Sequence, residues 1–120
     1  MSSMKRLLYT ICLASAILLT SCASREAINL KVHTDPEGSH IVYRVDDDQD
    51  APWIYLGVTP YQGVTMIASS SLDDDTTVTF KVMRRGYLDQ VRKWTGEQLV
   101  EEYETEGQIF WAPRLVKSLK

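Results

Sequence analysis

Three aspartates at alternate positions are the first residues in this chain that could do chemistry. Asp46, Asp48 and Asp50 have the carboxylate spacing that opens an EF-hand calcium loop. The rest of that loop is missing, because Ala51 stands where the sharp turn needs glycine and Gly57 stands where a bidentate glutamate should close the coordination. We therefore expect a solvated acidic loop. Specific Ca²⁺ binding is the alternative.

The two stretches before and after the turn Asp35-Pro36-Glu37-Gly38 alternate between apolar or small residues and polar ones. Period-two alternation is typical of strands with one buried face, and an Asp-Pro start with a closing glycine is typical of a tight turn. Residues 28–34 and 39–45 are therefore predicted to form an antiparallel hairpin. Its register places Val32 opposite Ile41 and Leu30 opposite Tyr43.

The same register places His33 directly opposite His40 on the outward face, with Cβ atoms about 5 Å apart. That distance allows both imidazoles to bind one metal ion. A zinc site usually needs three or four protein ligands, and only carboxylates such as Asp35 or Glu37 are near enough to complete it. Two exposed polar residues are the expectation, and a shared metal site is the alternative.

The chain lacks the sequence patterns of common enzyme classes. It has no GxSxG elbow, no HExxH pair and no phosphate-cradling glycine loop, so we predict a protein that is not an enzyme. Six aromatic residues could stack against sugar rings, although packing in the core is the favoured interpretation. They are Trp53, Tyr55, Tyr61, Trp94, Phe110 and Trp111.

The N-terminal residues have the three parts of a secretory signal. Lys5 and Arg6 precede an apolar run at 7–19, and the small residues Thr20 and Ser21 follow it. The run is too short for a bilayer-spanning helix, which needs about 20 apolar residues. We predict a signal peptide at 1–21, with an uncleaved anchor or an ordinary signal cleaved elsewhere as alternatives.

The string Leu19-Thr20-Ser21-Cys22 resembles a bacterial lipobox. The resemblance implies cleavage before Cys22, diacylation of its thiol and acylation of the new amino group, with residues 22–27 as a lipidated tether. Several acyl chains hold a protein firmly on a membrane. Ala23 and Ser24 follow the cysteine without an aspartate, which favours the periplasmic face of the outer membrane over inner-membrane retention. A Gram-positive host is the alternative.

Removal of residues 1–21 from the 120 leaves 99, which is enough for one small domain. The leader takes Lys5 and Arg6 with it, so 11 basic residues remain against 16 acidic ones and the formal charge becomes −5. Nucleic acid is therefore excluded as the expected partner. The mature chain also keeps no thiol for a disulfide once Cys22 carries lipid.

Further short segments with strand-like sequence patterns follow the predicted hairpin. Residues 53–56 are apolar on both faces, as in a strand covered from both sides, and a further strand runs through Tyr61, Val64 and Met66. Residues 76–83 and 88–94 alternate around the turn Arg84-Arg85-Gly86. Short strands with regular turn signals predict an all-β fold, a small antiparallel β-sandwich.

Three ordered motifs in this region carry a family resemblance. TDPEG at 34–38, LGVTPY at 56–61 and KVMRRGY at 81–87 together resemble the PEGA domain, over about 28–94. The resemblance implies a β-sandwich in a bacterial envelope and no catalytic residues. Ser39 replaces the alanine of the family's turn.

Residues 95–120 have a different pattern. Thr95-Gly96-Glu97-Gln98 resembles a capping box, and near-helical apolar spacing continues until Gly107, so a short helix is predicted. An extended tail with Ile109-Phe110-Trp111 follows. Either this tail packs on the sandwich and covers the second face of residues 53–56, or Phe110 and Trp111 dock a partner.

The sequence thus predicts a non-catalytic, lipid-anchored envelope protein. Its expected role is binding or scaffolding, as an accessory subunit of an envelope protein assembly. A glycan- or peptidoglycan-binding module is the alternative, and a calcium-stabilised envelope protein is a further one. No cofactor is expected beyond the covalent lipid on Cys22.

Overall fold

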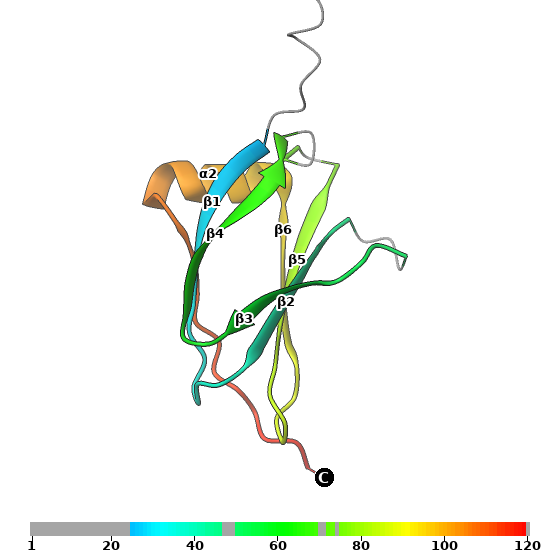
Figure 1. The fold of residues 1–120 in the computed structure, drawn as a ribbon, viewed down its shortest axis with the longest axis vertical. Coiled ribbons are helices and arrows are strands. Elements are labelled where there is room, and N and C mark those ends of the chain that lie inside the picture. The colour runs from blue at the N-terminus through cyan, green and yellow to red at the C-terminus, as the bar shows by residue number, and fades with distance from the viewer. Residues whose placement is uncertain (1–24, 47–49, 70–71, 74, 120) are drawn as a thin grey trace, which may run out of the picture.

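The computed structural model of the chain describes residues 25–46, 50–69, 72–73 and 75–119. The predictions for the signal peptide, for Cys22 and for Asp48 lie outside these residues. Within them the chain forms two β-sheets packed face to face, with one helix at the end where the first strand begins (Figure 1). The prediction of a small all-β sandwich with a helix near the C-terminus is confirmed.

The three-stranded sheet has the order β4 (Tyr61–Ala68), β1 (Arg25–Val32), β7 (Ile109–Trp111). The four-stranded sheet has the order β3 (Ile54–Val58), β2 (His40–Val45), β5 (Thr77–Met83), β6 (Gln90–Thr95). All neighbouring strands are antiparallel except β1 and β7, which are parallel. The helix α2 (Gly96–Glu106) connects β6 to β7.

The predicted hairpin between the first two strands is wrong. β1 pairs with β4 and β7, whereas β2 pairs with β3 and β5 in the other sheet. Residues 33–39 cross from one sheet to the other, so Val32 does not face Ile41 and His33 does not face His40. Alternation reports which side chains are buried: β1 buries Ile28, Leu30 and Val32, and β2 buries Ile41 and Tyr43, with Val42 between them also buried. It carries no information about which strand is the neighbour.

The core lies between the sheets and is built from the inward positions of the strands. Buried aromatic rings run through its centre, with centroid separations of 5.7 Å from Tyr43 to Phe80, 5.4 Å from Phe80 to Trp94 and 6.5 Å from Trp94 to Trp111. Burial, reinforced by the nearby Tyr61, raises the pKa of the Tyr43 hydroxyl. Each fully buried large side chain contributes about 1.5–3 kcal/mol.

The local signals for the hairpin of β5 and β6 and for α2 are confirmed. Gly86 has a φ of 89° in the tight turn between the strands. The Thr95 hydroxyl accepts the Gln98 N–H and the Gln98 side chain accepts the Thr95 N–H, which is the predicted capping box. Gly107 ends α2 in the left-handed conformation. No helix in the described part of the chain is long and apolar enough to cross a membrane.

The C-terminal tail is part of the domain. β7 extends the three-stranded sheet, where Ile109 and Trp111 are buried and Phe110 between them is 46 % exposed. The prediction that the tail covers residues 53–56 is wrong, because β7 pairs with β1 in the opposite sheet. Trp53, Ile54 and Tyr55 therefore stay exposed on an edge strand and its approach.

Candidate binding surface

Neither predicted metal site is assembled in the described part of the chain. Asp46 has a φ of 74° and its N–H donates to the Thr77 carbonyl, which turns the chain out of β2. No group of three or more His, Cys, Asp or Glu side chains close enough to share a metal occurs among the described residues. Calcium binding stays a prediction, since Asp48 lies outside them.

Each histidine has a partner of its own. The Nδ1 atom of His33 lies 2.9 Å from a carboxylate oxygen of Glu37, and that of His40 lies 3.0 Å from the Tyr55 hydroxyl. His40 is on the four-stranded sheet and His33 follows β1 of the other sheet. The cross-strand geometry on which a shared metal site depended is therefore absent.

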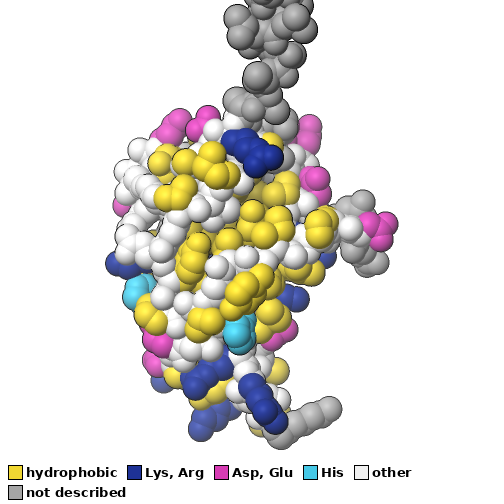
Figure 2. All heavy atoms as spheres, in the orientation of Figure 1, with side chains coloured by type: hydrophobic (Ala, Val, Ile, Leu, Met, Phe, Trp, Pro, Cys, Tyr) yellow, Lys and Arg dark blue, Asp and Glu magenta, His cyan; other side chains and the backbone are white. Residues whose placement is uncertain are grey.

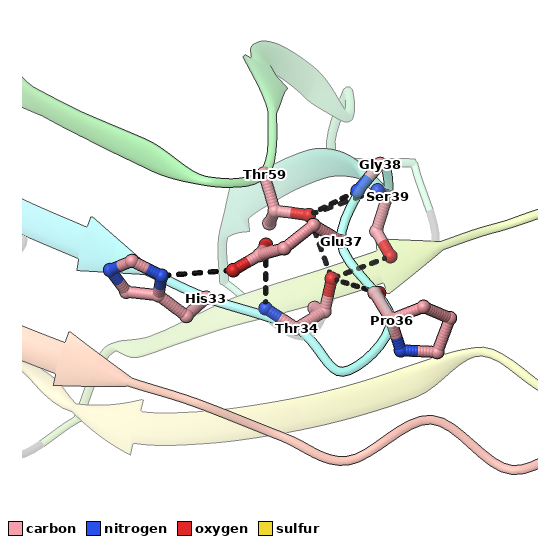
Figure 3. Close-up of polar contacts among 7 residues, drawn as sticks. All are labelled: His33, Thr34, Pro36, Glu37, Gly38, Ser39 and Thr59. Carbon is pink, nitrogen blue, oxygen red and sulfur yellow. Dashed lines mark hydrogen bonds and ion pairs between the residues drawn. The ribbon is translucent and has the colours of Figure 1, made fainter.

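The two sheet-to-sheet crossovers are joined by buried hydroxyls (Figure 3). Thr59, between β3 and β4, accepts hydrogen bonds from the N–H groups of Gly38 and Ser39, at 3.0 and 2.9 Å. The Thr59 and Thr34 hydroxyl oxygens lie 2.7 Å apart. The TDPEG and GVTP motifs, which are far apart in the sequence, thus meet at one place in the fold.

The proton positions in this network follow from its geometry. The Thr34 hydroxyl donates to the Pro36 carbonyl at 2.8 Å, so it must accept from Thr59 and from the Ser39 hydroxyl at 3.0 Å. Thr34, Ser39 and Thr59 are at most 5 % exposed, so the cluster holds the crossovers together and leaves no hydroxyl free for a substrate.

Glu37 closes the cluster on its exposed side. Desolvation alone would raise the pKa of this carboxyl, but hydrogen bonds from the Thr34 N–H and the His33 ring outweigh it and hold the pKa below its ordinary value. The glutamate of the TDPEG motif is therefore a capping residue of the crossover. Sequence reasoning missed this role because it assigned the motif to a hairpin turn.

The most distinctive surface feature is the flank formed by the adjacent edge strands β3 and β4. Of the eleven large hydrophobic side chains that are exposed in the described residues, six belong to these strands and the residue before them. We call them the β3–β4 flank: Trp53, Ile54, Tyr55, Val58, Val64 and Met66. Trp53 lies over the outer face of the four-stranded sheet, whereas Val64 and Met66 lie on the outer face of the three-stranded sheet. Figure 2, viewed from the side where β3 and β4 lie in front in Figure 1, shows hydrophobic side chains gathered over it.

Two cations hold Trp53 in place on this flank. The Arg44 guanidinium lies 4.4 Å and the Lys81 ammonium 4.3 Å from the centroid of its ring. Such cation–π contacts are each worth about 0.5–1 kcal/mol at exposed sites. The indole ring thus has two positive charges close to its centre before anything binds to it.

The remaining aromatic candidates separate into core and surface. Trp94 and Trp111 are buried in the core, as the packing interpretation predicts. Tyr61 is half-buried. Phe110 is exposed on the outer face of the three-stranded sheet, 6.0 Å from the Lys31 ammonium. Of the two residues predicted to dock a partner, only Phe110 is therefore accessible.

Comparisons with known proteins found no matching family model, no matching curated protein and no matching solved structure. The PEGA assignment thus stays a prediction from motifs.

Proposed function

We propose that this chain is a non-catalytic, lipid-anchored envelope protein of PEGA type that serves as a binding or scaffolding subunit of a protein assembly. The observation that carries the proposal is the concentration of exposed apolar side chains on the β3–β4 flank. Exposed apolar side chains that gather on one part of a protein mark candidate interaction sites. Aromatic residues, methionine and arginine are also enriched in protein interfaces.

The ordering of Trp53 supports protein docking. A partner that contacts an immobilised side chain does not have to supply the entropy of fixing it, which amounts to about 0.5–1.5 kcal/mol for each flexible side chain. Arg44 and Lys81 already hold the indole ring. We expect Trp53 and the neighbouring Tyr55 to contribute most of the binding energy.

The proposed anchor places one end of β4 close to a bilayer. A lipidated Cys22 stands three residues before Arg25, and three residues reach about 10 Å at most. Arg25 is the first residue of β1 and pairs with Ala68 at the end of β4. The proposed location is the periplasmic face of the outer membrane.

A glycan-binding module is the second candidate, because Trp53 and Tyr55 are both exposed aromatic residues on the same edge. Sugar rings stack on such side chains. This function would give binding to purified peptidoglycan sacculi that is lost when either ring is removed. Calcium stabilisation, the third candidate, would give a melting temperature that falls on chelation.

The test is mild crosslinking and affinity purification of the full-length lipoprotein from its native envelope. Tyr55→Glu places a charge on the flank, and Leu88→Glu is the matched control at an exposed position away from it. We expect partners to be lost with Tyr55→Glu and retained with Leu88→Glu. Equal capture by both variants would refute docking through the flank.

The anchor is tested separately. Cys22→Ser should abolish incorporation of labelled palmitate and release the protein from the membrane fraction. A variant that stays in the membrane fraction without label would show that the leader is an uncleaved anchor.

A further inference from the structure

The backbone groups of β4 that point away from the sheet can be assigned from the pairing. The His33 N–H donates to the Trp111 carbonyl, so the odd-numbered residues along β1 direct their backbone groups towards β7. The even-numbered residues then face β4, where they pair with positions 61, 63, 65 and 67. The other residues of β4 direct an N–H and a C=O to the open edge: Gln62, Val64, Met66 and Ala68.

None of these eight backbone groups has a hydrogen-bond partner in the described part of the chain. The edge also lacks the features that normally prevent strand addition, which are charges, prolines and bulges. β4 spans eight residues without any of them. The opposite edge strands differ, because β6 contains Arg92 and Lys93 and β7 has only three residues.

We propose that the open edge of β4 binds an extended strand of a partner protein, which extends the three-stranded sheet by β-augmentation. This inference rests on the proposed docking function and names the kind of partner segment. Backbone hydrogen bonds would supply affinity, and side chains at alternate positions would supply specificity. Val64 and Met66, 58 % and 50 % exposed, would pair with apolar side chains of the added strand.

The charges beside β4 indicate the ends of that strand. On the outer face of the sheet, Arg25 pairs with Ala68 at one end of β4 and Lys31 pairs with Gln62 at the other. None of the outward positions described on β1 and β4 is acidic. A segment with an apolar centre and acidic ends therefore complements this face, and a basic segment does not.

A second copy of this chain is disfavoured as the occupant. Two copies that pair symmetrically through β4 run antiparallel, which places the Arg25 ends at opposite ends of a strand about 27 Å long. With Cys22 at most about 10 Å from Arg25, the two proposed lipids would point in opposite directions. Both lipids could enter one membrane only if the paired strands lay flat along it, so a different chain is the expected occupant.

The first test uses the full lipoprotein in nanodiscs and a synthetic peptide of alternating threonine and valine with glutamate at both ends. Amide exchange should slow about tenfold or more at Val64 and Met66 and stay unchanged in β6. Met66→Pro removes an N–H at the open edge of β4 and keeps every hydrogen bond between β4 and β1. It should therefore weaken peptide binding at least about tenfold. Met66→Thr, which keeps the N–H, is the matched control.

If Met66→Pro unfolds, the same peptide N-methylated on every central residue replaces that variant, because it can pair through neither edge. Absence of peptide binding at millimolar concentration, protection at another edge, or equal binding by the methylated peptide would overturn the proposal.

Photo-crosslinkers at Val64 and Tyr55 in the native envelope separate this inference from the proposed function. A partner that crosslinks at Val64, is lost with Met66→Pro and is kept with Met66→Thr supports both β-augmentation and the docking function. A partner crosslinked at Tyr55 alone overturns β-augmentation and leaves the docking function standing. Crosslinks to the chain itself favour a second copy and overturn the inference, and no crosslink at either position overturns both.

Discussion

The side-chain oxygens of Thr34 and Thr59 lie 2.7 Å apart, although 25 residues separate them in the sequence. This contact joins the two points at which the chain passes from one sheet to the other. Because Thr59 also accepts two backbone N–H groups from the first crossover, one hydroxyl satisfies three partners. The sandwich therefore depends on a side chain that lies outside both hydrophobic faces.

Replacing Thr59 should test this dependence. Thr59→Val keeps the shape but leaves the Ser39 N–H without its acceptor, whereas the Gly38 N–H keeps the Thr59 carbonyl at 3.1 Å. We expect a loss of about 1–3 kcal/mol in unfolding free energy. Thr59→Ser keeps the oxygen and should lose less than half as much. Urea titration measures both, and equal losses would assign the effect to the methyl group.

Glu37 should make the stability depend on acidity. Its pKa is lower in the folded chain than its ordinary value of 4.5, so the unfolded state binds more protons between the two values. The stabilisation is present above the unfolded pKa and is lost as the pH falls through the folded one. The contribution is small, because the side chain is 40 % exposed.

The measurement is urea unfolding at about pH 6 and about pH 3, compared with Glu37→Gln, which cannot titrate. The wild-type chain should lose more stability than the variant over this interval. An identical pH profile for the two proteins would contradict the assignment of Glu37 as a crossover cap.

Trp111 and Phe110 should respond very differently to truncation. Trp111 is 7 % exposed and packs edge-on against Trp94, so Trp111→Ala is expected to cost about 3–5 kcal/mol. Phe110→Ala, at an exposed position, should stay within about 1 kcal/mol. Thermal unfolding distinguishes them, and a mild effect of Trp111→Ala would argue that the tail does not dock on the sandwich in solution.

Thr65 offers a stabilising change. Its hydroxyl is buried in the described structure without a hydrogen-bond partner, and its side chain faces the core from β4. Thr65→Val replaces this hydroxyl with a methyl group of similar size, and we expect a gain of about 1 kcal/mol. The readout is the urea midpoint at unchanged slope. A loss of stability would indicate a partner for the hydroxyl.

Local features of the fold followed from the sequence. The capping box at Thr95 and the left-handed Gly107 bound α2 as predicted, because both depend on residues within one turn of the helix. The turn before Tyr87 also formed as predicted, since the Tyr87 N–H closes it locally on the Arg84 carbonyl, and backbone bonds from residues 116–118 add to it. Alternation also predicted the inward positions of the strands, including Val78, Phe80 and Val82.

Strand partners were decided only in three dimensions. β1 could bury the same side chains beside β2 or beside β4, and the sequence pattern is identical in both cases, so the hairpin of His33 and His40 was not distinguishable from a crossover. For the same reason the sequence did not predict that Trp53 is exposed. Whether the tail covers Trp53 depends on the sheet in which β7 pairs.

The candidate surface divides in the same way. The residue types at 53–66 determined that an apolar segment exists, as they are read directly from the chain. Its exposure on one flank, and the open edge of β4, arose because the strands were assigned to two sheets of three and four strands with β3 and β4 at their ends. Edges belong to a completed sheet, and no stretch of sequence specifies alone whether it will have a neighbour.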